Sequence, residues 1–191
     1  MKKLNHIGTK KLETKNLILR KLTLSDLSDI DSKLISDKEI VEFMSWHDKT
    51  QIIEEIKEII TSGYEKNQTY YWAIELCETN EFIGVIYVKR FHNEKRIADI
   101  NGCIDKKHRK CGYGLESLNE VITFLIEKIG FHRIEGVCNM NNKNSVCVME
   151  KAGMTREGVL RGTAINLDEN GNPEDLIIYS ILSNDKASGN P

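Results

Sequence analysis

Residues 108–114, with the sequence HRKCGYG, combine the residue types that hold a phosphate group. The basic residues Arg109 and Lys110 precede two glycines, Gly112 and Gly114, and an amphipathic pattern starts directly after them. A helix N-terminus presents unpaired N–H donors and a partial positive charge, and glycines let an anion approach the backbone. The spacing therefore predicts a local site for a phosphate or a pyrophosphate at this turn.

Two common phosphate motifs do not fit this turn. The P-loop requires a lysine directly after its last glycine, and the dinucleotide fingerprint requires a third glycine where Ser117 stands. The residues DKKHRKC also separate the turn from the preceding strand, which is too long a gap for the dinucleotide fold. On these residues alone, an ordinary glycine turn beside a solvated basic run is the alternative interpretation.

Hydrophobic periodicity predicts a mixed α/β fold in which strands are grouped before and after a central helix. This arrangement favours a mixed sheet with helices on both faces. The expected elements are, in chain order, a strand at 16–22, a helix capped by Ser25, a second helix ending near Gly63, an antiparallel meander at 70–76, 82–91 and 96–104, the helix after Gly114, a strand at 132–139, a helix from Asn142 to Gly153, and strands at 154–160 and 175–182.

The length of 191 residues and a hydrophobic content of 40% suit one compact domain. We expect this domain at residues 12–183, with flexible ends at 1–11 and 184–191. A net charge of −2 argues against nonspecific binding of nucleic acid. No apolar run reaches the roughly 20 residues of a membrane helix, and the start lacks a signal-peptide pattern. Five scattered cysteines without a C-x-x-C pair are typical of reduced thiols. We therefore expect a cytoplasmic protein without a metal site.

Two patterns in this sequence resemble motifs of the GCN5-related N-acetyltransferase (GNAT) superfamily. RKCGYG, at 109–114, matches the signature R/Q-x-x-G-x-G/A. NKNSVCVMEKAGMTREGVLRG, at 142–162, resembles the N-x-x-S-x-x-x-x-E-K-x-G block of the Rim-type branch, which acetylates the N-terminal amines of ribosomal proteins. The likeness covers about residues 11–183, and two separated motifs in the right order are a specific signal.

The resemblance implies a curved, largely antiparallel mixed sheet whose two central strands splay apart, with acetyl-coenzyme A (acetyl-CoA) as cosubstrate in the cleft. By analogy, the loop at 109–114 takes the pyrophosphate, and the pantetheine arm follows the strand that ends near Ile104. Asn142 and Ser145 match positions that approach the coenzyme from the next helix. The implied cofactor-binding residues are Ile104, Arg109, Lys110, Cys111, Gly112, Tyr113, Gly114, Asn142 and Ser145.

Acetyl transfer to an amine requires a neutral nucleophile, a stabilised oxyanion and a protonated leaving thiolate. At pH 7 an α-amine is neutral to about 15% and a lysine amine to about 0.04%, a gap of about 3.5 kcal/mol. An N-terminal acceptor therefore needs less help from a base. Asp99 aligns with an acidic residue of many family members, and we expect it to be the general base, directly or through a water. An outward-facing strand carboxylate is the alternative, and Glu75 is a weaker candidate.

Many family members protonate the thiolate with a tyrosine, and Met149 stands at that position. Ser145 is the expected hydrogen-bond partner of the sulfur, although a plain helix-start role is the alternative. We expect Cys103 and Cys111 to be packing or loop residues, because no paired base accompanies them. Direct transfer in a ternary complex is therefore preferred over an acyl-cysteine intermediate.

The resemblance places the amine acceptor between the early helices and the final hairpin. The preferred function is acetylation of a protein N-terminus; the alternatives are a small amine, such as a polyamine, an amino acid or an aminoglycoside, and a noncatalytic acetyl-CoA sensor. A homodimer is an expectation from the family only. The side chains considered for the acceptor site are Trp46, Tyr71 and Trp72, which are more often core residues, and the hairpin acids Asp168, Glu169, Glu174 and Asp175, which otherwise form a solvated turn.

Overall fold

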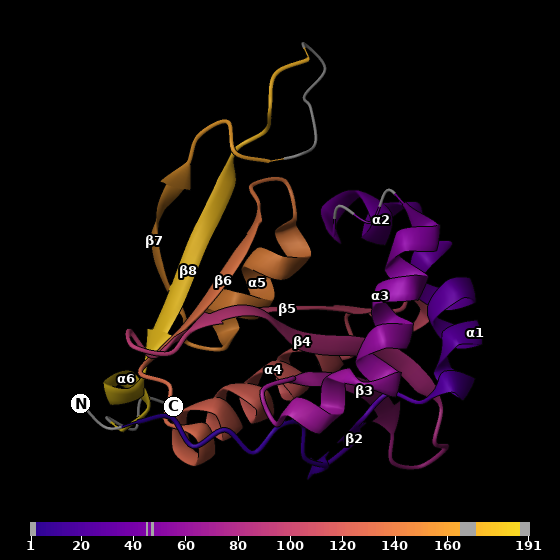
Figure 1. Ribbon diagram of the computed structural model, residues 1–191. Helices are drawn as coiled ribbons and strands as arrows, with labels where there is room; N and C mark the ends of the chain where they lie inside the picture. The colour runs from indigo at the N-terminus through magenta and orange to yellow at the C-terminus, as the bar shows by residue number, and fades with distance from the viewer. Residues whose placement is uncertain (1–2, 45, 47, 165–170, 188–191) are drawn as a thin grey trace. The chain divides into compact units, whose positions relative to one another are not determined.

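The protein is described here by a computed structural model that covers residues 3–44, 46, 48–164 and 171–187. These residues form an eight-stranded sheet with the strand order β1-β2-β3-β4-β5-β6-β8-β7, shown with its helices in Figure 1. The strands are β1 (Leu12–Glu13), β2 (Leu17–Arg20), β3 (Tyr71–Leu76), β4 (Phe82–His92), β5 (Ile97–Ile104), β6 (Arg133–Asn139), β7 (Thr155–Leu160) and β8 (Leu176–Leu182).

The sheet is mixed and mostly antiparallel, as the sequence predicts. The ladders β1–β2, β2–β3, β3–β4, β6–β8 and β7–β8 are antiparallel, and β5–β6 is parallel. The β5–β6 ladder joins only Ile97–Asp99 to Arg133–Glu135, although both strands continue beyond it. Backbone groups of β5 after Asp99 therefore lie outside this ladder.

The helices are more fragmented than the periodicity predicts. They are α1 (Leu27–Asp29), α2 (Lys38–Met44), α3 (Lys49–Thr61), α4 (Tyr113–Phe124), α5 (Lys143–Lys151) and α6 (Ser183–Ala187), with 3₁₀ turns at Leu24–Asp26, Gly63–Lys66 and Lys106–His108 and π turns at Ile30–Ile35 and Leu125–Ile129. The prediction that Ser25 caps the first helix is wrong. Thr23 is the N-cap, in a reciprocal capping box with Asp26.

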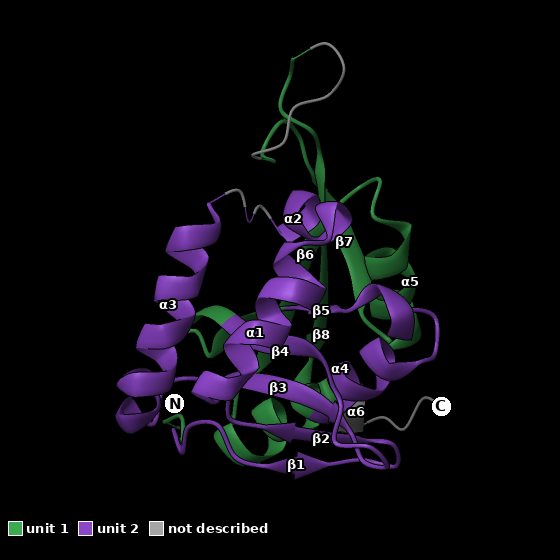
Figure 2. Ribbon diagram, turned by 90° about the vertical axis from the view of Figure 1, so that its right-hand side faces the viewer, with its two compact units in different colours: residues 1–5, 89–101, 121–191 green, residues 6–88, 102–120 purple. Residues whose placement is uncertain are grey.

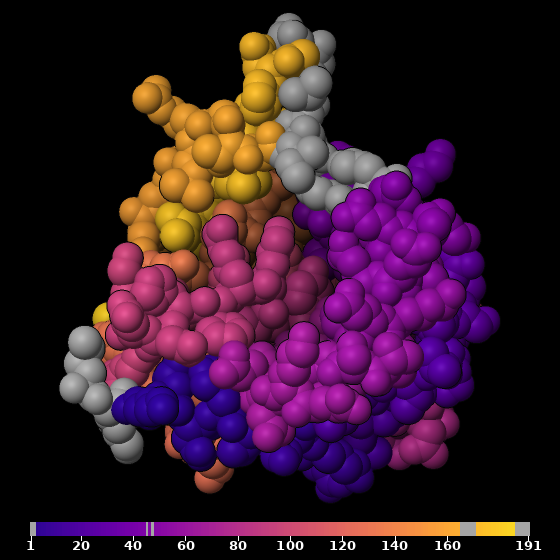
Figure 3. Space-filling view, in the orientation of Figure 1, coloured from indigo at the N-terminus to yellow at the C-terminus, as the bar shows by residue number. Residues whose placement is uncertain are grey.

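The chain forms two compact units, coloured separately in Figure 2. One unit comprises residues 6–88 and 102–120. Its core packs the π turn at Ile30–Ile35, α2 and α3 against β3 and β4, through Ile30, Ile40, Ile56, Ala73 and Val85. α3 lies at the surface in Figure 3. Because its buried isoleucines recur at helical spacing, the opposite side of α3 is polar and exposed.

The other unit comprises residues 1–5, 89–101 and 121–191. In it, α5 packs against β6, where Met149 fills the space that Gly136 leaves open. A Cβ atom on Gly136 would lie 2.7 Å from the sulfur of Met149, so this glycine permits the close approach of helix and strand. Asn142 caps α5, and Gly153 ends it with a left-handed φ of 77°, as the sequence predicts.

Both predicted flexible ends have anchored residues. Thr9 is buried, and its hydroxyl donates to the carbonyl of Thr69 at 2.8 Å. Leu4 is buried, and the adjacent amide of Asn5 donates to Ile129 at 2.8 Å. At the other end, residues expected in the tail form α6, and the Oδ2 atom of Asp185 accepts from the amide of Leu182 at 2.8 Å. Local polarity suggested loose ends, but Asn5 and Thr9 contact residues that are distant in the chain.

Candidate active site

The predicted phosphate loop connects β5 to α4 within one compact unit. Asp105 is buried and caps the turn at 106–108 by accepting the amide of His108 at 2.9 Å. Lys110 then takes a left-handed φ of 64° and Gly112 a φ of 89°, and α4 starts at Tyr113. A left-handed conformation costs a non-glycine residue about 1–2 kcal/mol. The loop therefore holds local strain, a feature that recurs at ligand clamps.

The loop is open on the side where an anion would approach. Lys110, Cys111 and Gly112 are exposed, and nothing lies within 4 Å of the position of a Cβ atom on Gly112. Glycine is required there because of its φ, not because of crowding. The exposed amides precede the positive end of α4, so the residues present fit a diphosphate.

Arg109 is not free to supply charge to that anion. Its guanidinium donates to Asp37 at 2.6 Å and to Glu39 at 2.6 Å, and its Nε atom donates to the carbonyl of Ile104 at 3.1 Å. Only 18% of the Arg109 side chain is exposed. The expectation that its side chain adds positive charge beside the phosphate needs correction, because two carboxylates already neutralise it.

Glu116, in the first turn of α4, has a different role from an anion ligand. Its carboxylate accepts from the hydroxyl of Thr14 at 2.6 Å, and from the amide and side chain of Asn16 at 2.8 Å each. Burial alone would raise the pKa of Glu116, but these hydrogen bonds outweigh it and lower the pKa. Glu116 therefore ties the helix that follows the phosphate loop to the turn between β1 and β2.

β5 approaches β4 very closely just before the loop. A Cβ atom on Gly84 would lie 2.3 Å from the carbonyl oxygen of Cys103, and one on Gly102 would lie 2.7 Å from that of Val85. Both distances are shorter than any normal contact, and both neighbours are backbone atoms. The two glycines therefore let β5 and β4 meet at the end of β5 where Ile104 leads into the loop.

Asp99 is a buried carboxylate on β5 in the second unit, with 7% exposure. It lies opposite Glu135 at the end of the β5–β6 ladder, and its Oδ2 atom accepts from Arg90 at 3.0 Å. Burial raises the pKa of Asp99 more than Arg90 and Lys89 lower it. The alternative of an outward-facing, solvated carboxylate is therefore wrong, and a buried carboxylate with a raised pKa suits a general base.

Asn142 and Ser145 lie together at the start of α5. The side-chain oxygen of Asn142 accepts from the amide of Ser145 at 3.0 Å. The hydroxyl of Ser145 is half-buried and has no hydrogen-bond partner among the residues that the structure describes. Met149, at the position of the family's tyrosine, is buried against Gly136. This position belongs to the core of the unit, and a larger tyrosine would clash there.

The cysteines near the predicted coenzyme track do not suit nucleophilic catalysis. Cys103 packs against the core of β3, β4 and the early helices, and burial raises the pKa of its thiol to about 12. Burial likewise raises the pKa of Cys138 to about 11. Cys111 is exposed in the loop, with the carbonyl of Arg109 3.6 Å from its sulfur. Cys103 is a packing residue, as predicted, because a thiol of that pKa stays protonated at neutral pH.

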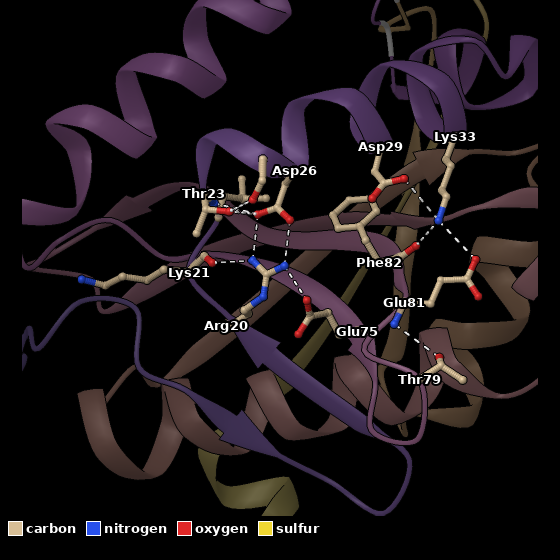
Figure 4. Close-up of polar contacts among 12 residues, drawn as sticks. Arg20, Lys21, Thr23, Asp26, Asp29, Lys33, Glu75, Thr79, Glu81 and Phe82 are labelled. Atoms are coloured by element: carbon tan, nitrogen blue, oxygen red, sulfur yellow. Dashed lines mark hydrogen bonds and ion pairs between the residues drawn. The ribbon is translucent and has the colours of Figure 1, made fainter.

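Glu75, the weaker candidate base, is held in an ion pair. Figure 4 shows its carboxylate at the guanidinium of Arg20, 2.5 Å away, while Arg20 also binds both oxygens of Asp26. Arg90, the partner of Asp99, is largely exposed, whereas Arg20 is partly buried between Glu75 and the buried Asp26. Glu75 instead stabilises the junction of β2 and β3.

The aromatic residues considered for the acceptor site lie in the core. Trp72 is fully buried and donates from Nε1 to the carbonyl of Lys10 at 2.7 Å. Tyr71 stacks on Tyr87 with ring centroids 4.5 Å apart, and Trp46 packs partly buried on the same core. Their more common role as core residues is therefore the correct one.

The hairpin acids that the structure describes are held by neighbouring donors. Glu174 accepts from the side chains of Asn139 at 2.5 Å and Asn141 at 3.1 Å, and Asp175 accepts from the amide of Gly162 at 2.8 Å. These contacts brace the turn that leads into α5. Asp168 and Glu169 lie outside the described residues.

One grouping of side chains has donor atoms typical of a metal site. Ligand atoms of Glu81, Asp105 and His108 lie within 4.8 Å of one another. However, His108 Nδ1 is bonded to Asp105 at 2.7 Å, and Lys33 lies 3.2 Å from Glu81, as Figure 4 shows for the latter pair. Both contacts already occupy these carboxylates, so the grouping does not require an ion. The amide and Nδ1 of His108 both bond to Asp105 in the turn before the loop.

The sequence located the loop and the residues that bound α5, but it did not indicate the partners of the loop. Asp37 and Glu39 are about 70 residues from Arg109 in the chain, and no local pattern marks them. Asp105 and Glu116 had a usable signal, since each is an acidic residue in the first turn or cap of a helical segment.

Comparisons with known proteins agree with the predicted family and fold. The family profile described as Acetyltransferase (GNAT) domain matches residues 16–155. The N-acetyltransferase YoaA of Bacillus subtilis is 31% identical over 173 residues, covering 90% of this chain and 96% of YoaA. Two solved structures share the fold. The ribosomal-protein-S5-alanine acetyltransferase of Vibrio fischeri has a TM-score of 0.74 and 17% identity, and the match covers 92% of this chain and 98% of that one. A chimera of the spermidine N-acetyltransferase SpeG of Vibrio cholerae has a TM-score of 0.74 and 20% identity, and the match covers 90% of this chain and 98% of that one. Among the described residues, no helix is both long and apolar enough to span a bilayer.

Proposed function

The chain belongs to the GNAT family of acetyl-CoA-dependent N-acetyltransferases, and from that premise we propose that its acceptor is the α-amine of a protein N-terminus, with ribosomal proteins as the substrate class. The observation that carries this choice is Asp99, a buried carboxylate with a raised pKa that accepts from Arg90 at 3.0 Å. One carboxylate base is enough for an α-amine, which is already about 15% neutral at pH 7. A lysine or polyamine amine would require about 3.5 kcal/mol more.

The loop geometry supports the position of the cosubstrate. Backbone amides from Lys110 to Gly114 would bind the diphosphate at the start of α4, and the exposed ammonium of Lys110 would add one charge. The pantetheine arm would run along β5 toward Ile104, since backbone groups of β5 beyond Asp99 lie outside the β5–β6 ladder.

The proposed reaction is a direct transfer. The neutral amine attacks the thioester carbonyl carbon, the C–S bond breaks, and Asp99 takes the amine proton directly or through a water. The leaving thiolate has a conjugate-acid pKa near 8.5, so it needs limited assistance. The hydroxyl of Ser145, which has no other partner in the described chain, would hydrogen-bond the sulfur. The tyrosine acid of other members has no equivalent at Met149.

A thiol-release assay against a matched acceptor panel tests this proposal. The panel contains peptides with a free N-terminal serine or alanine, the same peptides with a blocked N-terminus and a free lysine, and spermidine. We expect turnover of the free N-termini only. Preferred turnover of spermidine or another small amine would replace the proposed acceptor, and tight coenzyme A binding without any turnover would indicate a sensor.

A further inference from the structure

Arg109 connects the phosphate loop to the first turn of α2. Asp37, which accepts from Arg109 through Oδ2, also caps α2, because its Oδ1 atom accepts the amide of Glu39 at 3.0 Å. The carbonyl of Asp37 accepts the amide of Val41 at 3.0 Å. A single carboxylate therefore holds both the helix start and the guanidinium. All these residues belong to one compact unit.

The charges around Arg109 oppose a direct contact with a diphosphate. The guanidinium has two carboxylates at 2.6 Å, so the local net charge is negative. A phosphate brought to the same guanidinium would meet two like charges at short range, which is unfavourable. Lys110, one residue later, is exposed and makes no ion pair with the residues that the structure describes. Of the two basic residues in the loop, Arg109 therefore makes contacts within the protein, and Lys110 faces the solvent.

The geometry of the Arg109 contacts suits a rigid connection. Three of the guanidinium donors go to two segments: the end of β5 and the start of α2, where Asp37 and Glu39 each accept one hydrogen bond. Arginine can bridge several acceptors with its planar fork, whereas lysine cannot hold three in fixed directions. A change in the loop is therefore transmitted to α2 through one side chain.

We propose that Arg109 is a positioning residue that couples the diphosphate loop to α2, so that binding of the cosubstrate orders the first turn of α2. This rests on the proposed function only in placing the cosubstrate at residues 110–114. The coupling acts through Asp37 and Glu39, and Arg109 itself makes no contact with the diphosphate. For an acceptor that binds near α2, thermodynamic linkage makes its affinity depend on the contact of Arg109 with Asp37 and Glu39.

The coupling is tested from both sides of the contact with the variant R109Q and the double variant D37N/E39Q. K110Q is the control, because Lys110 is the basic residue proposed to face the anion. Coenzyme A binding is measured by calorimetry, and hydrogen exchange of residues 38–44 is measured with and without coenzyme A. For R109Q and D37N/E39Q, we expect the Kd for coenzyme A to stay within about threefold of wild type. We expect protection of residues 38–44 on binding to be lost in both. K110Q should weaken binding about fivefold and keep the protection.

The triple variant R109Q/D37N/E39Q should behave like either parent, because residues that act through one contact are not additive. Should R109Q lower coenzyme A affinity more than tenfold while D37N/E39Q does not, Arg109 is a ligand of the diphosphate and the proposal is wrong. Unchanged protection of residues 38–44 in both variants would also overturn it. If R109Q fails to fold, D37N/E39Q gives the same comparison with the arginine intact. Failure of every acceptor in turnover assays would contradict the proposed function instead, since these binding measurements need no acceptor.

Discussion

Replacing Gly84 by alanine should destabilise the protein at the end of β5 that leads into the phosphate loop. The added methyl group would lie 2.3 Å from the carbonyl oxygen of Cys103 and 3.1 Å from the Cα atom of Ile104. An ordinary contact begins at 3.4 Å, so β5 must move by about 1.1 Å (3.4 minus 2.3). Overpacking of this kind costs about 1–3 kcal/mol, and the upper end applies because both neighbours are backbone atoms.

The unfolded chain offsets part of that cost, because alanine has less backbone entropy to lose than glycine, by about 0.4–1 kcal/mol. The net loss is then about 2 kcal/mol, which lowers the Tm of a chain of this length by about 4–8 °C. Because Ile104 continues into residues 105–112, the same shift should weaken coenzyme A binding.

Gly158 provides the matched control for this substitution. It lies in β7, has no left-handed φ, and nothing lies within 4 Å of its Cβ position. G158A should therefore leave the Tm unchanged or raise it slightly, and it should leave coenzyme A affinity unchanged. Thermal unfolding of both variants measures the Tm, and calorimetric titration measures their affinity for coenzyme A. The close-approach argument fails if G84A is as stable as G158A.

Three further outcomes follow from buried or paired groups. D99N should lower kcat by about 10²–10⁴-fold without lowering stability at pH 7. The pKa of Asp99 is raised in the fold, so its charged form is disfavoured there. The stability that the protonated form of Asp99 contributes at low pH is therefore lost as pH rises through that pKa. Retention of full turnover by D99N would exclude it as the base. For Glu116 the sign is opposite: its pKa is lowered, so its contribution is present above the ordinary glutamate pKa and is lost as pH falls. E116Q should thus be less stable than wild type at pH 7, and this difference should shrink as pH falls below the ordinary glutamate pKa, as urea unfolding would reveal. Cys103, whose pKa is about 12, should resist a thiol reagent at pH 8, whereas the exposed Cys111 should react. Mass spectrometry of the labelled peptides distinguishes the two cysteines. Fast labelling of Cys103 would contradict its packing in the core.

Local signals predicted most of the fold because they depend on neighbouring residues. Asn142 and Gly153 bound α5 as a cap and a left-handed terminus, which a short stretch of sequence determines. The strands lie within about two residues of their predicted limits, because alternating burial follows from the two-residue period of a strand. The first helix was harder: Thr23 and Ser25 are both good caps, and only the position of Asp26 favours Thr23.

Contacts between distant residues determined what the sequence could not predict. Met149 is a core residue because Gly136 on β6 leaves room for its sulfur, and nothing near Met149 in the chain indicates this. Glu75 had the residue type of a general base, yet Arg20 occupies it. In both cases a partner from another element, which is distant in the sequence, determines the role of the side chain.

The two basic residues of the phosphate loop illustrate the same point within one motif. Arg109 and Lys110 are adjacent, carry the same charge and match the same signature, so sequence alone gives them one role. In the fold, Arg109 meets Asp37 and Glu39, while Lys110 takes a left-handed φ that leaves its side chain exposed. A positive charge contributes to an anion site only where no carboxylate has already compensated it. We therefore propose that the backbone amides and Lys110 bind the diphosphate, and that Arg109 connects that site to α2.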